Sequence, residues 1–146
     1  ISRTIVYLGD RHLNTANIIK AIMNGHCVIS DGPFVNLYFQ NITGDKIISG
    51  DSIDDIDDPR WELYASLISS EEFGAFERFV IYRGVEGAAE EDIMYERAQF
   101  NNGYKAELSD FTMDKSIASD FHGYIRGELT TRKGNICLTN PIWIQA

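Results

Sequence analysis

The stretch FVIYRGV, residues 79–85, does most to decide the fold expected for this chain. Its β-branched and aromatic residues predict a buried strand, and the strand runs through an arginine straight into a glycine. The whole chain has 146 residues, 44% of them hydrophobic and 12% aromatic. A chain of this length and composition is typical of one domain with a substantial core.

Residues 1–58, which precede this strand, predict a β-rich N-terminal part with one helix. The helix is expected over residues 14–24, because Ile18, Ile19, Ile22 and Met23 form one apolar face and Gly25 is a natural stop. Strands are expected at residues 3–8, 27–29, 34–40 and 46–49.

Residues 59–146 predict a more helical part. A first helix is expected over residues 59–68, and a second begins at the capping box of Ser69 and Glu72 and runs up to the arginine strand. Two more are expected over residues 88–98 and from Asp114 to Phe121. Further strands are expected at residues 104–108, 135–138 and 142–145. The fold class is therefore α+β, with mostly antiparallel strands in two packed layers and helices to one side.

The charge balance limits the possible partners. Acidic residues outnumber basic ones by 22 to 13, which gives a formal charge of −9. This excess argues against general nucleic-acid binding, which needs a basic face, and it suits a protein that meets a basic partner.

The setting expected from the sequence is the reducing cytoplasm. The chain has no run of 18 apolar residues and no visible leader, so we expect neither a membrane span nor a membrane partner. Cys27 and Cys137 lie far apart, and Cys137 sits in an apolar run, which favours a buried free thiol over a disulfide.

Five aspartates crowd into residues 51–58. A calcium loop would need a central glycine, which is absent, although Glu62 falls at the twelfth position from Asp51. A solvated loop is the simpler interpretation, and calcium binding is the alternative.

Two further features are candidates for binding chemistry. Arg83 carries a guanidinium suited to bidentate phosphate contacts, and Gly84 would let the backbone approach a ligand. Thr112 stands just before the helix expected at Asp114 and offers a hydroxyl that would hold the arginine. The three histidines, His12, His26 and His122, are scattered and show no metal-ligand spacing.

The residues at 82–85 and 112–121 resemble the arginine and hydroxyl regions of the R-S-E class of mono-ADP-ribosyltransferases, in particular the phage Mod-type enzymes that modify host proteins. The resemblance covers roughly residues 59–146, so that this part would be ADP-ribosyltransferase-like. It implies an NAD-dependent glycosyltransferase that moves ADP-ribose to a protein side chain such as arginine, or a degenerate relative of such an enzyme.

The same resemblance assigns roles to single residues. Arg83 would bind the NAD phosphates, with Tyr82 and Gly84 shaping the pocket and Thr112 standing for the last serine of the hydroxyl motif. The family's Glu-X-Glu loop has no counterpart after Thr112, where Glu128 is the only glutamate, so the catalytic role would fall to Glu128. Asp110 and Phe111 occupy the first two hydroxyl positions.

A second hypothesis needs no catalysis. The charge of −9, the aspartate-rich loop and the many aromatic residues suit a small acidic interaction protein of the immunity or inhibitor type. Such a protein would capture a basic protein partner through residues 51–58 or 86–92, and the binding would be sensitive to salt.

Overall fold

The central strand of the molecule is β10 (His122–Thr131), which is hydrogen-bonded along both edges. One edge pairs with β7 (Phe76–Val85), and the other pairs with β11 (Ile136–Thr139) and then β12 (Ile142–Gln145). The computed structural model describes residues 1–54, 61–109, 111 and 121–145. These four strands form the middle of an eight-stranded sheet, sheet A.

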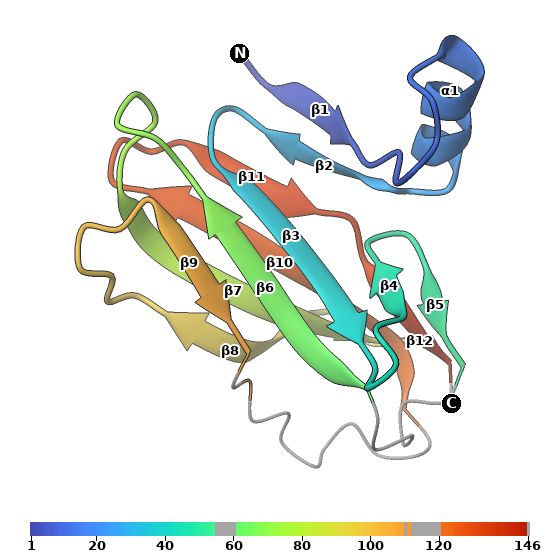
Figure 1. Ribbon diagram of the computed structural model, residues 1–146. Helices are drawn as coiled ribbons and strands as arrows, with labels where there is room; N and C mark the ends of the chain where they lie inside the picture. The colour runs from blue at the N-terminus through green and yellow to red at the C-terminus, as the bar shows by residue number, and fades with distance from the viewer. Residues whose placement is uncertain (55–60, 110, 112–120, 146) are drawn as a thin grey trace.

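The outer strands complete two layers (Figure 1). Sheet A also contains β1 (Arg3–Val6), β2 (Cys27–Ser30), β5 (Ser52–Ile53) and β8 (Asp92–Arg97). Sheet B contains β4 (Lys46–Ile48), β3 (Phe34–Gln40), β6 (Glu62–Ile68) and β9 (Lys105–Leu108), in that spatial order. All recorded strand pairs are antiparallel except β5 with β12, which is parallel.

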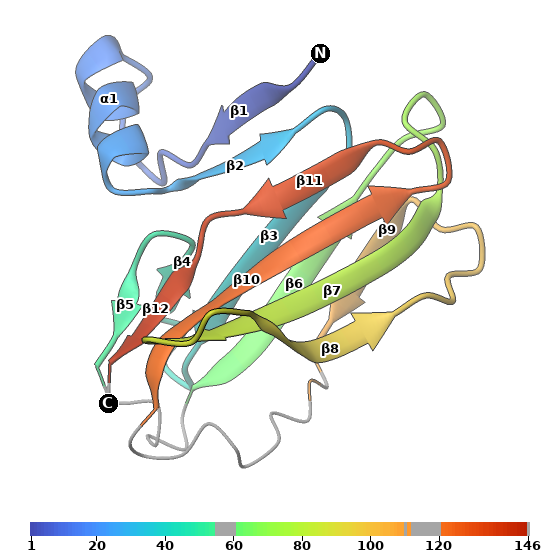
Figure 2. The same cartoon turned by 180° about the vertical axis from the view of Figure 1, so that it is seen from behind.

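The core lies between the two sheets, as the view from behind shows (Figure 2). Successive side chains of a strand point to opposite faces, so every second residue is buried. In β3 these are Val35, Leu37 and Phe39, and in β10 they include Ile125 and Leu129. The expected α+β class with mostly antiparallel sheets is confirmed.

Helix α1 (Thr15–Met23) confirms the helix expected over residues 14–24, and it is the one helix among the described residues. Asn14 caps it, because its side chain accepts a hydrogen bond of 2.8 Å from the backbone N–H of Asn17. Its apolar face does not enter the core, since Ala21 is its one fully buried residue. None of the described helices is long and apolar enough to cross a membrane.

The helix expected over residues 59–68 is wrong where the structure describes it, because residues 62–68 form β6. Leu63 and Leu67 are four residues apart, a spacing that suits a helix face as well as a strand. Ala65 decides between the two: Leu63, Ala65 and Leu67 are all buried, which is the period of two that a strand shows.

The helix expected to follow Ser69 is also wrong, since β7 already begins at Phe76. Phe76 and Phe79 are three residues apart and both fully buried, which imitates a helical face. A register shift in the pairing of β7 with β10 explains it: Arg78 lies opposite Thr130, and Phe76 opposite Thr131. The extra residue of this bulge brings both phenylalanines to the same face.

The helix expected over residues 88–98 is wrong as well, because β8 occupies residues 92–97. Strand β10 was not expected at all. The helix expected from Asp114 to Phe121 lies outside the described residues, except for Phe121 itself. Residues 1–58 and 59–146 do not form separate sheets, because β3 pairs with β6 and β2 pairs with β11.

Both cysteines are free thiols, as expected. Cys137 has no exposed surface, and its burial raises the pKa of the thiol to about 11. Cys27 is half-buried at the edge of the sandwich.

We expect iodoacetamide at about pH 8 to modify Cys27 of the native protein well before Cys137. Only about one in a thousand Cys137 thiols is ionised at that pH, and the thiolate is the reactive form. Peptide mass mapping over time measures the two rates, with urea-unfolded protein as the control in which both react. Equal rates in the native protein would contradict the packing around Cys137.

Candidate functional site

Arg83 lies near the end of β7 on the inner face of sheet A. In the pairing with β10 it is directly opposite Ile125, which is fully buried. Its Nη2 donates to Oδ2 of Asp92 on the neighbouring β8 at 3.3 Å. Its guanidinium carbon lies 6.0 Å from the ring centre of Phe121. Arg83 therefore sits at the rim of the core, beside an acidic and an aromatic partner.

Glu128 lies on the other face of the same sheet. It follows Ile125 by three residues in a regular part of β10, and side chains three residues apart in a strand point to opposite faces. Its carboxylate is held by Arg126 at 3.5 Å. Arg83 and Glu128 are thus not brought together, and Thr112, the third expected member of the site, lies outside the described residues.

Tyr82 and Gly84 belong to the outer face with Glu128. The Arg126 guanidinium stacks over the Tyr82 ring, 4.4 Å from its centre. Gly84 was expected to admit a ligand, but the ring of Tyr124 covers it. A Cβ atom built on Gly84 would stand 2.3 Å from Cζ of that ring. The glycine is needed here by a side chain of the protein itself.

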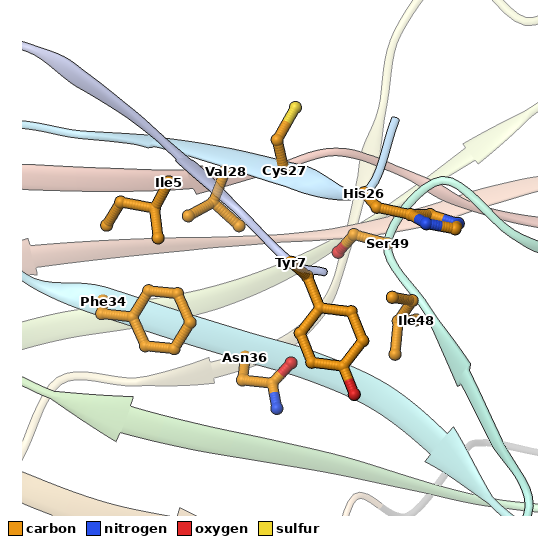
Figure 3. A pocket seen from close by; sticks show the side chains of 9 residues that line it. All are labelled: Ile5, Tyr7, His26, Cys27, Val28, Phe34, Asn36, Ile48 and Ser49. Carbon is orange, nitrogen blue, oxygen red and sulfur yellow. The ribbon is translucent and has the colours of Figure 1, made fainter. Parts of the chain in front are cut away.

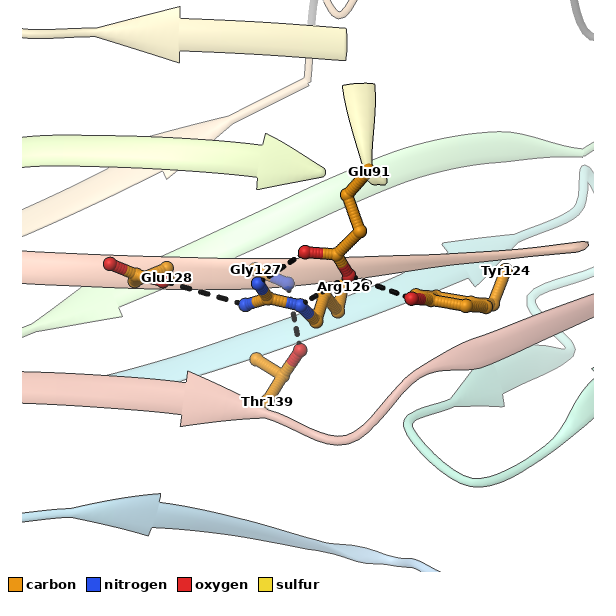
Figure 4. Close-up of polar contacts among 6 residues, drawn as sticks. All are labelled: Glu91, Tyr124, Arg126, Gly127, Glu128 and Thr139. Carbon is orange, nitrogen blue, oxygen red and sulfur yellow. Dashed lines mark hydrogen bonds and ion pairs between the residues drawn. The ribbon is translucent and has the colours of Figure 1, made fainter. Parts of the chain in front are cut away.

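A polar cluster on this outer face joins two segments of the chain, the β7–β8 loop and β10 (Figure 4). Glu91, just before β8, accepts two hydrogen bonds from Arg126, at 2.8 Å from Nε and 2.6 Å from Nη2. The Tyr124 hydroxyl donates to Oε1 of Glu91 at 2.8 Å. We call these residues, with Glu128, the Arg126 cluster; it fastens the β7–β8 loop to β10.

The cluster shifts the titration of its members in the directions that hydrogen bonding to charged groups requires. The Arg126 hydrogen bonds lower the pKa of Glu91, and burial only partly opposes them. The pKa values of Arg126 and Tyr124 are raised, in each case chiefly by the hydrogen bond to Glu91. At neutral pH the Glu91 carboxylate and the Arg126 guanidinium are therefore both ionised.

An open groove of about 620 Å³ lies beside the Arg126 cluster. It is lined by residues 85–88, 122–124 and 143–145, and we call it the sheet A groove. Tyr124 and Trp143 meet edge to face in its wall, with ring centres 5.3 Å apart, and 43% of the Trp143 surface is exposed. Glu86, an exposed residue, is the one Asp, Glu, Lys or Arg among the described lining residues.

The aspartate-rich loop is described only at its start. Asp51 closes the turn between β4 and β5, because its Oδ2 accepts from the Ile48 N–H at 3.2 Å and its Oδ1 lies 2.8 Å from Nε2 of His26. Within the described ranges, no group of three or more His, Cys, Asp or Glu side chains is placed to hold a metal ion. The last aspartates of the run lie outside those ranges.

Comparisons with protein-family models, with curated proteins and with solved structures gave no match to this chain.

The residues that build this face were largely missed from the sequence. The signal was present in YIRGEL, residues 124–129, where large polar residues alternate with inward Ile125, Gly127 and Leu129. That alternation is typical of a half-buried strand, but only two of its inward residues are large and apolar. Glu91 falls within the helix wrongly expected over residues 88–98.

We expect Glu91→Gln to lower the free energy of unfolding at about pH 7 by about 1–2 kcal/mol, since it removes charge-assisted hydrogen bonds. Because the folded state depresses the pKa of Glu91, its stabilisation is present above the unfolded value near 4.5 and is lost as the pH falls through the folded value.

Urea unfolding of the Glu91→Gln variant at about pH 7 and about pH 3 measures this, and the deficit should shrink at the lower pH. Glu90→Gln, at an exposed neighbouring carboxylate, is the matched control and should cost little. A deficit of the same size at both pH values would contradict the assigned role of Glu91.

We expect Gly84→Ala to destabilise the protein by about 1–3 kcal/mol, because the added methyl group must displace the Tyr124 ring. Gly103→Ala is the control: the nearest atom to its Cβ is 3.8 Å away and its φ is not positive. Denaturant unfolding gives the stabilities, and the ring proton shifts of Tyr124 report the displacement. Equal stability of the two variants would show that the ring does not need the glycine.

Proposed function

We propose that this chain is a non-catalytic interaction module that captures a basic segment of a partner protein in the sheet A groove. The observation that carries the proposal is the make-up of the groove wall, which includes the Trp143 and Tyr124 rings and Glu86. Aromatic faces and a carboxylate together are the groups that bind a lysine or arginine side chain.

The surroundings of the groove favour a cationic occupant. The β7–β8 loop contributes Glu86 and Glu90, both exposed, and the chain as a whole carries −9. The Arg126 cluster keeps Arg126 engaged with Glu91 and Glu128 on the same face. The long-range field and the local contacts therefore attract the same sign of charge.

The Arg126 cluster also explains how the groove keeps its shape. Glu91 stands at the end of the loop that forms one wall, and its double hydrogen bond to Arg126 fixes that end on β10. Gly87 in the same loop has a φ of +82°, a left-handed conformation that glycine adopts without strain. A wall set in advance loses less conformational entropy when a partner binds.

NAD-dependent ADP-ribose transfer remains the competing prediction. It needs the arginine that binds the phosphates and the glutamate that acts on the ribose to face one bound dinucleotide. Arg83 and Glu128 point to opposite faces of sheet A. This separation is why we propose the interaction module.

We expect decalysine to bind the protein, and we expect its affinity to fall as NaCl is raised from about 20 mM to about 300 mM. Trp143→Ala and Glu86→Gln should each weaken binding by about two- to fivefold, the size of one exposed cation–π or ion-pair contact. Isothermal titration calorimetry measures both effects.

Glu71→Gln is the matched control, since it removes one exposed carboxylate from the loop before β7. Its affinity should fall only by the small amount that the loss of one negative charge from the whole protein causes. Equal losses in Glu71→Gln and Glu86→Gln would refute binding at the groove. A parallel titration with NAD tests the competing prediction: NAD binding that Arg83→Ala abolishes would favour the transferase.

A further inference from the structure

Strand β1, near the N-terminus, lies at an edge of the sandwich (Figures 1 and 2). Strand β1 ends sheet A: it pairs with β2 on one side, and no described strand pairs with its other side. Three of its four residues are exposed. A free strand edge presents unpaired backbone N–H and C=O groups, which are a template for another strand.

Beneath β1 the two sheets are not closed. A small pocket of about 70 Å³ lies between the β1–β2 pair and the β3–β4 pair, and its apolar lining includes Ile5, Tyr7, Phe34 and Ile48 (Figure 3). Ile5 is 38% exposed and Tyr7 is 52% exposed, so apolar side chains reach the mouth of the pocket. The edge therefore combines a free backbone with an apolar slot.

Helix α1, which contacts β1, carries further exposed apolar residues. Ile19, Ile22 and Met23 are all exposed, Met23 at 81%, although an amphipathic helix normally turns such residues inward. Several large apolar residues exposed on one short helix are a candidate interaction surface.

The local charge differs in sign from that of the rest of the chain. Residues 1–30 hold three basic side chains, Arg3, Arg11 and Lys20, against one acidic side chain, Asp10, for a net +2. Residues 31–146 hold the remaining 10 basic and 21 acidic side chains, for a net −11. Charge complementarity at this edge therefore selects an acidic partner, the opposite of the groove.

We propose that β1 and α1 form a docking surface for an extended segment of a partner protein, with apolar residues at alternate positions and acidic residues at its ends. The segment adds a strand to the free edge of β1, so that its main chain satisfies the backbone groups there. One apolar side chain of the segment enters the slot beside Ile5 and Tyr7, and the acidic ends lie near Arg3 and Arg11.

Two other occupants fit the surface less well. A lipid surface would cover the apolar residues of α1, but acyl chains offer no partner to the backbone groups of β1. A second copy pairing β1 with β1 would bring two surfaces of the same positive sign together. A protein strand with acidic ends satisfies the backbone, the slot and the charge at once.

The probe is an acetylated, amidated peptide of alternating valine and threonine with two glutamates at each end, titrated into the full chain labelled with ¹⁵N. We expect its binding to protect the β1 amides from hydrogen exchange. The same peptide with lysines in place of glutamates is the control. The lysine form is also expected to bind the sheet A groove, so the comparison is made at the β1 amides alone. Stronger protection of these amides by the lysine form than by the glutamate form overturns the proposal.

Ile5→Lys, at the mouth of the slot, and Met23→Glu, on the exposed face of α1, should each weaken binding of the glutamate peptide by about tenfold or more. Ile42→Lys is the matched control, since Ile42 is 80% exposed in the β3–β4 loop, and it should bind like the parent chain. Equal affinity of Ile5→Lys and Ile42→Lys refutes the site.

Two further measurements distinguish the other occupants. Sedimentation of the protein with phosphatidylserine vesicles, lost in Met23→Glu, would assign the surface to a membrane. Dimerisation in sedimentation velocity without peptide, lost in Ile5→Lys, would assign it to a second copy. Either result overturns the proposal. Glu86→Gln should leave binding of the glutamate peptide unchanged, so failure of the groove and failure of this edge are separable.

Discussion

The alternation of side chains along β10 and β7 is the constraint on which the rest of this structure depends. Ile125 and Leu129 must face sheet B to close the core, so their neighbours Arg126 and Glu128 must face outward. The same parity turns Arg83 inward, because it is paired with Ile125. Which side chains enter the core thus determines the face of every polar residue on these strands. It places Arg83 and Glu128, on adjacent strands, on opposite faces of the sheet.

The polar side chains on the outward face then need hydrogen-bond or ion-pair partners, because the larger ones are partly buried. Arg126 has a side chain only 24% exposed, and it is satisfied by Glu91, by Glu128 and by the Tyr82 ring beneath it. Without such partners, the desolvation of a half-buried guanidinium would destabilise the folded state by more than its packing contacts stabilise it. The consequence reaches past stability: holding Glu91 holds the β7–β8 loop, and that loop forms a wall of the groove.

Much of the fold could be predicted from the sequence where the pattern was local. β3 alternates buried and partly buried residues without interruption and was placed at its true bounds, and helical spacing of apolar residues with a stop at Gly25 placed α1. Prediction failed where a pattern was ambiguous. Leu63 and Leu67 fit two periods, and a bulge gave Phe76 and Phe79 the spacing of a helix face. Such distinctions depend on the partner strand, which a single sequence does not reveal.

The candidate site was harder to predict for the same reason. Gly84 was linked to a ligand because glycine permits close approach, and the structure shows close approach by Tyr124 instead. The hydrogen bonds of Glu91 in the Arg126 cluster reach residues 33 and 35 positions further along the chain, so no local motif reveals the cluster. The proposed occupant of the groove depends on net charge, because an excess of carboxylates does not depend on how helices and strands are assigned.

The distribution of that charge has a further physical meaning. If −9 were spread evenly, every surface of the domain would attract the same partners, and neither end would discriminate. The sequence instead gathers +2 in its first 30 residues, where apolar side chains and a free strand edge are exposed, and −11 in the remainder. An exposed apolar edge is an aggregation risk, and basic residues along it oppose pairing between copies while still admitting an acidic strand. Under the two proposals, these charges would restrict the edge to acidic partners, and the acidic remainder of the chain would direct basic partners to the groove.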